Sequence, residues 1–145
     1  MLTSSEKRDS ILRMIAQLRQ MAEGLSGKLR GGEDPTELLA DPRASLDALL
    51  GPIAGVVQRL DSASAAQMVN DPDVLAAWAE VTAAEADAHR AAGDSAAAAA
   101  LARRALELAV EAHRRSSSDI PELPPLIARL RTQVDAHAPP PGPIG

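Results

Sequence analysis

The residues of this chain that could bind a metal ion or move a proton are His89, His113 and His137. A helical metal site places a second histidine or a carboxylate about three or four residues from the first, so that both ligands share a face. Glu85 lies four residues before His89, but a solvated pair on a helix surface explains that spacing equally well. We expect His113 on the surface of a long helix and His137 near the C-terminal tail, and we predict no metal site.

Nucleophilic catalysis and phosphate binding would require other patterns. The serines lie at expected helix starts or in a loop at 116–118, where capping and solubility account for them. The segment Gly24 to Lys28 resembles a phosphate-binding loop, but its spacing is wrong and no strand precedes it. Acidic pairs such as Glu80 with Asp87 fit a solvated helix face. We therefore expect no catalytic residue, no cofactor and no enzymatic activity.

Charge and composition restrict the class of partner. The net charge is −5, and the basic residues are dispersed along the chain, which argues against nucleic-acid binding. The chain has no cysteine, which excludes disulfides and thiolate metal sites. The N-terminus reads as an amphipathic segment rather than a secretory signal, and no stretch approaches the ~20 apolar residues of a membrane span. We expect a cytoplasmic, bacterial protein with no membrane partner.

The kind of hydrophobic residue favours helices over strands. The chain contains no Phe or Tyr, and Trp78 is its only aromatic residue. Ala and Leu favour helices, whereas strands draw on β-branched and aromatic residues, and small side chains let helices approach closely. The sequence thus predicts an all-α fold. We expect one helical domain over residues 1–137 and a disordered proline-rich tail over 138–145.

An apolar stripe predicts a long first helix from about Ser4 to Leu29, ended by Gly31 and Gly32. The stripe could also be a seam between two copies of the chain. Its members recur every three or four residues: Ile11, Met14, Ile15, Leu18, Met21, Ala22, Leu25 and Leu29.

Proline and glycine divide residues 33–70 into shorter helices. Asp34–Pro35 and Asp41–Pro42 each predict an N-cap followed by a proline in the first turn. Gly51–Pro52 ends one helix, and we expect further short helices from Ile53 to Leu60 and from Ser64 to Val69.

Three longer helices are expected after residue 70. The first begins at Asp71–Pro72 and ends near Ala92, and Gly93–Asp94 forms a short turn. The second reaches about Arg115. The last carries five apolar residues at helical spacing: Leu123, Leu126, Ile127, Leu130 and Val134.

The two helices around Gly93 resemble a tetratricopeptide repeat over residues 79–112. Small residues stand where that repeat brings its helices together, at Ala86, Ala98 and Ala105, and Gly93 falls at the turn. His89 and Ala102 replace large residues of the pattern, so an ordinary alanine-rich hairpin is the alternative. No second copy is found at a matching period, which argues against a repeat array.

A wider resemblance covers nearly the whole chain. The opening segment from Asp9 to Leu18, the break at Leu49–Gly51 and the turn at Arg59–Asp61 are similar to those of a family of short, all-helical bacterial proteins of unknown function. The resemblance implies an all-helical protein with a tetratricopeptide-like second half. It implies no chemistry, because that family has no assigned activity.

A binding face follows from the tetratricopeptide resemblance. Glu80, Asp87 and Arg90 project from one side of the helix at intervals of seven and three residues, which suits recognition of an extended or helical segment. In the repeat's pattern that face also carries Ala83 and Ala91. The alternative is that these charges only face water.

Trp78 is the other candidate contact residue. A single Trp in an Ala- and Leu-rich core fills a large gap between helices, but Trp is also enriched at binding hot spots. Both roles stay open at this point.

Three function hypotheses remain. The first is a non-enzymatic adaptor that binds another protein or peptide through a helical groove. The second is a structural homodimer assembled through the first helix. The third is a small-molecule sensor or enzyme whose site is built from scattered residues and would need a closed pocket.

Overall fold

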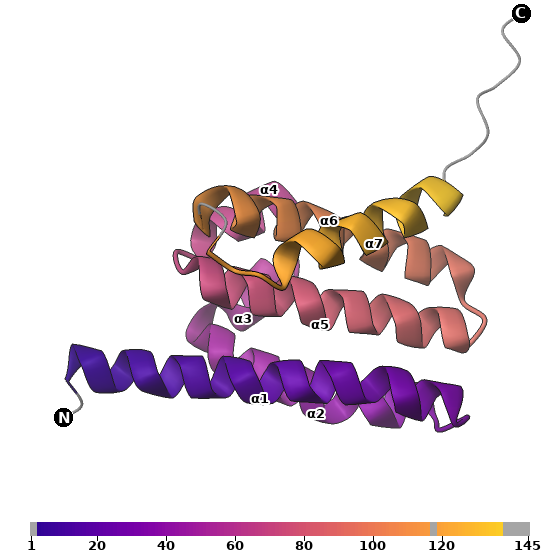
Figure 1. Ribbon diagram of the computed structural model, residues 1–145, viewed down its shortest axis with the longest axis horizontal. Helices are drawn as coiled ribbons and strands as arrows, with labels where there is room; N and C mark the ends of the chain where they lie inside the picture. Colours follow the sequence, from indigo (N-terminus) through magenta and orange to yellow (C-terminus); the bar gives the residue numbers. More distant parts are fainter. Residues whose placement is uncertain (1–2, 117–118, 138–145) are drawn as a thin grey trace, which may run out of the picture.

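The computed structural model describes residues 3–116 and 119–137, and within these ranges it contains helices and no strand (Figure 1). The prediction of an all-α fold is confirmed. The tail predicted over 138–145 lies outside the described residues. The elements are α1 (Ser4–Arg30), α2 (Pro35–Leu50), the 3-10 turn η1 (Gly51–Ile53), α3 (Ala54–Val57), α4 (Ser62–Met68), α5 (Pro72–Ala91), α6 (Ser95–Ser116) and α7 (Leu123–His137).

Helix α5 is the centre of the fold. It contacts α1 and α2 on one side and α6 and α7 on the other (Figure 1). Its N-cap is Asp71, whose side chain accepts from the backbone N–H of Asp73 at 2.9 Å, and Pro72 begins the helix. Residues on almost every side of α5 are buried, including Leu75, Ala79 and Ala86. A helix buried in this way positions groups on several faces at once.

Helices α5 and α6 form an antiparallel hairpin joined at Gly93, whose φ of 84° favours glycine (Figure 1). Asp94 caps α6 by accepting from the backbone N–H of Ala97 at 3.1 Å. Ala86, Ala98 and Ala105 are all fully buried, as expected where two helices pack closely.

The apolar stripe of α1 packs within the chain. Ile15 and Leu18 belong to the main hydrophobic core, and Leu25 joins a smaller cluster with Leu39 of α2 and Ala88 of α5. Met21, by contrast, is 36% exposed. A capping box between Thr3 and Glu6 begins the helix, which runs one residue beyond the predicted end.

The prediction of a helix start at Asp41–Pro42 is wrong. Helix α2 begins at Pro35, with Asp34 as its N-cap, and continues through Pro42 without a break. Leu39, Pro42, Leu46 and Leu50 are all buried on one face. Burial of this face keeps the helix continuous although proline removes one internal hydrogen bond.

The helices that follow α2 are shorter or displaced relative to the prediction. The segment expected to be helical from Ile53 to Leu60 contains only the last residue of η1 and the single turn of α3. Helix α4 begins at Ser62 because Asp61 caps it. Helix α7 packs on α6, and its Leu123 and Leu130 are fully buried. Among the described residues, no helix is long and apolar enough to cross a membrane.

Candidate partner-binding groove

Helices α1, α5 and α7 run in the same direction, with α5 between the other two in the view of Figure 1. A hollow of about 180 Å³ lies along them, which we call the α1/α5/α7 groove. It is lined by Arg19, Ala22 and Glu23 of α1, Glu80, Ala84 and Asp87 of α5, and Leu126 and Arg129 of α7.

The hollow exists because two small residues face it. Ala22 and Ala84 contribute only methyl groups from α1 and α5. Leu126 of α7 contributes a larger apolar side chain, and this residue is 8% exposed. An apolar floor of this kind gains free energy when an aliphatic side chain covers it, at roughly 25 cal/mol per Å² of buried apolar area.

Two carboxylates pair with one guanidinium at the first end of the groove, and a third carboxylate, that of Glu23, also lines the hollow. Arg19 Nε donates to the two carboxylate oxygens of Glu80 at 2.8 and 3.0 Å, and Arg19 Nη1 lies 3.7 Å from Glu122. Burial raises the pKa of Glu80, Arg19 opposes this shift, and the nearby charges of Glu122 and Glu23 add to it. Negative charge therefore exceeds positive charge at this end.

The second end of the groove has the opposite balance. Asp87 accepts from Arg90 Nη1 at 3.0 Å and from Arg129 Nη1 at 3.1 Å. The Asp87 carboxylate thus forms ion pairs with two guanidiniums. The other terminal nitrogen of Arg90, Nη2, is covered and has no hydrogen-bond partner among the described residues.

Some of the predicted partner-binding residues lie at this groove, and others do not. Glu80 and Asp87 line it, and Arg90 reaches it through Asp87. Ala91 is exposed, but it is not part of the lining.

Two of the predicted contact residues are in the core. Trp78 is 3% exposed and Ala83 is 1% exposed, so neither can touch a partner in this conformation, and that part of the expectation is corrected. The reason is that α5 is buried on nearly all sides, whereas the prediction assumed that one face of the helix is exposed to solvent. The guanidinium of Arg104 lies 5.2 Å from the centre of the Trp78 ring and helps to cover it.

Sequence reasoning missed the groove residues outside α5. Arg19 and Glu23 stand one turn apart on α1, and Arg129 lies in α7. The spacing of the first two, four residues, was a signal that they share a face. The spacing does not predict which side of α1 faces α5.

A second hollow, of about 270 Å³, lies beside Trp78 on another side of α5. Its polar groups are occupied: Arg104 donates to the carbonyl oxygens of Leu60 at 2.9 Å and Val57 at 3.0 Å, and Gln58 donates to Asp47 at 2.8 Å. These bonds hold α2 and α3 against the hairpin. The residues around this hollow thus have structural tasks.

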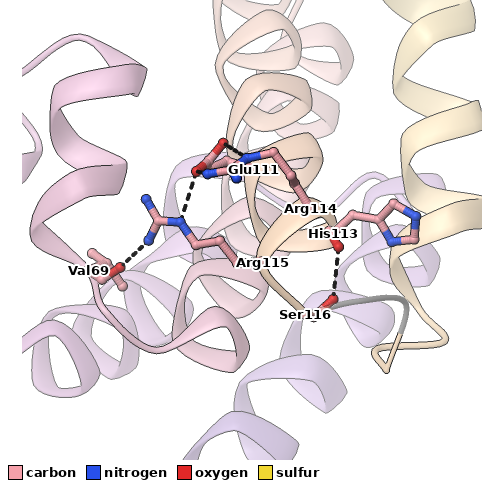
Figure 2. A network of polar contacts seen from close by, with 6 residues as sticks. All are labelled: Val69, Glu111, His113, Arg114, Arg115 and Ser116. Atoms are coloured by element: carbon pink, nitrogen blue, oxygen red, sulfur yellow. Dashed lines mark hydrogen bonds and ion pairs between the residues drawn. The ribbon is translucent and has the colours of Figure 1, made fainter.

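Figure 2 shows another polar cluster, where α6 meets the end of α4. A hollow of about 340 Å³ lies beside it. Arg115 donates to the Val69 carbonyl at 2.7 Å and to Glu111 at 2.9 Å, and Arg114 also binds Glu111. Bonds from Arg114 and Arg115 lower the pKa of Glu111 to about 2. The cluster joins the end of α4 to α6, so we assign it to the fold.

His89, near the end of α5, and His113, near the end of α6, lie in separate surroundings. His89 Nδ1 lies 3.9 Å from Asp94, while Glu85 binds Arg43 at 3.0 Å instead of His89. The ring of His113 is half-buried and points away from the Glu111 cluster (Figure 2). Within residues 3–116 and 119–137, no three His, Asp or Glu side chains are grouped so as to hold a metal ion.

Comparisons with a collection of protein families, with curated proteins and with solved structures found no match to this chain.

Proposed function

We propose that this chain is a protein-interaction module that binds a short segment of another protein in the α1/α5/α7 groove. The observation that carries the proposal is an apolar floor, made by Ala22, Ala84 and Leu126, that lies between charged groups of both signs. Polypeptides combine an aliphatic side chain with charged neighbours in this way, and recognition of helical or extended segments commonly uses such grooves.

The tetratricopeptide resemblance supports the same surface. Glu80 and Asp87 belong to the face that the resemblance predicts for partner binding, and both line the groove. Catalysis by a hydroxyl, thiol or imidazole has no support there, because the lining residues are carboxylates, guanidiniums and aliphatic groups.

A homodimer through α1 has less support than an adaptor. Its seam would need the apolar stripe, and Ile15, Leu18 and Leu25 are at most 3% exposed within one chain. Leu12, at 43%, is the most exposed large apolar residue of α1. Met21, nine residues further along, is 36% exposed, and isolated apolar residues of this kind are ordinary on a protein surface.

The experiment that tests the proposal fills the groove instead of removing its charges. Replacing Glu80, Asp87 and Arg90 would also break ion pairs to α1 and α7, so lost binding would be ambiguous. Ala22→Phe places a ring in the hollow from a position that is already partly exposed. Ala16→Phe, at an exposed position of the same helix outside the groove lining, is the matched control.

We would select peptides from a random display library on the full chain and measure their binding to both variants. Peptides should bind the wild type and Ala16→Phe equally, and lose affinity for Ala22→Phe. Selection of no peptide, or equal binding to all three proteins, would contradict the proposal.

A further inference from the structure

The charges of the α1/α5/α7 groove are divided between its two ends. At the first end Glu80 and Glu122 pair with Arg19, and Glu23, four residues after Arg19 on α1, forms no ion pair among the described residues. At the second end Arg90 and Arg129 share Asp87. These three guanidiniums and four carboxylates have a net charge of −1, and the two ends of the groove carry opposite charge.

Helix termini reduce this separation without cancelling it. Glu122 immediately precedes α7, and Arg90 lies in the last turn of α5, so each is partly balanced by about half an elementary charge from the helix dipole. The first end keeps an excess of about one and a half negative charges, and the second end keeps about half a positive charge. Half-buried side chains such as Glu80 and Asp87, 15% and 20% exposed, feel these charges with less screening than fully exposed groups do.

The separation of the two ends sets a length for the ligand. Glu80 and Asp87 are seven residues apart in α5, which at 1.5 Å per residue is about 10 Å along the helix axis. Ala84 and the apolar floor lie between them. About the same distance separates residues i and i+7 of a helix, or residues three apart in an extended chain.

We infer that the groove takes a segment of a partner protein in which an aliphatic side chain lies between a basic and an acidic residue about 10 Å apart. The aliphatic side chain covers Ala22, Ala84 and Leu126. The basic residue meets Glu23 and Glu122, and the acidic residue meets Arg90 and Arg129. This inference rests on the proposed function and names the chemistry of the partner.

Four synthetic helical peptides test it, each with one central leucine and one variable residue at each end of a seven-residue spacing. The ends are Lys and Glu, Lys and Lys, Glu and Glu, or Gln and Gln. Four extended peptides with the same four pairs of end residues, at a three-residue spacing, test the other conformation. Binding is measured by isothermal titration calorimetry with the full chain.

The Lys/Glu peptide should bind at least about threefold more tightly than any same-charge or neutral peptide, which is the size of effect expected for partly screened ion pairs. Glu23→Lys should remove that preference by weakening the Lys/Glu peptide and strengthening Glu/Glu. Glu33→Lys, in the loop after α1 and outside the groove lining, is the charge-matched control and should leave the preference unchanged.

The outcomes separate the two proposals. Equal binding of all peptides to the wild type, lost with Ala22→Phe, would overturn the inference and leave the proposed function standing. A preference for Lys/Glu that Glu23→Lys does not alter would also overturn it. Failure of every peptide to bind would contradict both.

Discussion

Alanine residues have opposite effects on two sides of α5: on one side they allow close packing, and on the other they leave a hollow. Helices α5 and α6 pack against each other, and Ala79, Ala83 and Ala86 of α5 and Ala98, Ala102 and Ala105 of α6 are at most 1% exposed. Toward the groove, Ala84 lies between α1 and α7, and the missing side chain leaves a hollow. A small residue at a helix crossing closes the contact, whereas a small residue between two flanking helices opens a site.

The largest expected effect is on the closed side. Trp78→Ala should lower the free energy of unfolding by about 3–5 kcal/mol, because the buried indole is replaced by a cavity. Chemical denaturation monitored by circular dichroism measures the change, since the variant lacks the tryptophan signal. An unchanged denaturation midpoint would mean that Trp78 is not part of the core.

Enlarging an alanine should distinguish the crossing from the surface. Ala105→Leu should destabilise by about 1–3 kcal/mol, because the added carbons have no room between α5 and α6. Ala100→Leu, at an exposed position of α6, should change stability by no more than about 0.5 kcal/mol. Equal melting temperatures for the two variants would refute the tight crossing.

Removing a guanidinium that joins two helices should have a smaller effect. Arg115→Ala loses the bond to the Val69 carbonyl and one bond to Glu111 (Figure 2), at a cost of about 1.5 kcal/mol. Arg103→Ala, at an exposed position of α6, is the control. Faster hydrogen exchange in α4 than in the wild type should accompany the loss.

As the pH falls, the contributions of Glu111 and Glu80 to the stability of the fold should change in opposite directions. The pKa of Glu111 falls from 4.5 to about 2 in the folded chain, so its contribution to stability is present above pH 4.5 and is lost as the pH falls toward 2. Glu111→Gln should therefore lose less stability than the wild type in that range, measured by urea denaturation at several pH values. An identical pH dependence would contradict the role of the Arg114 and Arg115 bonds.

Glu80 should act in the other direction. Burial raises its pKa above 4.5, so the folded chain holds a proton that the unfolded chain releases, and Glu80 contributes more stability as the pH falls through its raised pKa. Glu80→Gln should remove this dependence between the raised value and pH 4.5. A stability curve parallel to that of the wild type would count against burial as the main influence.

Local sequence signals predicted the helices well where a cap and a periodic face agreed. Helix α5 lies between Asp71–Pro72 and Gly93–Asp94 as expected, because both signals are contained in a few neighbouring residues. Pro42 misled the prediction, because burial of the α2 face outweighs the local cost of a proline.

The groove was only half predictable. Spacing on one helix placed Glu80 and Asp87 on a shared side, but their neighbours Arg19 and Arg129 come from helices about 61 and 42 residues away in sequence. Such partners depend on how three helices pack, which no local pattern contains. For the same reason the sequence did not predict the burial of Trp78 and Ala83, which depends on the helices that pack around α5.

The most direct test of the groove is a nuclear magnetic resonance titration of the labelled full chain with the helical Lys/Glu peptide. The proposed function predicts that the largest amide shift changes fall at Ala22, Ala84 and Leu126, and that Ala22→Phe abolishes them while Ala16→Phe does not. Shift changes centred on the hollow beside Trp78 or on the α4–α6 cluster, or no changes at all, would contradict binding in the α1/α5/α7 groove.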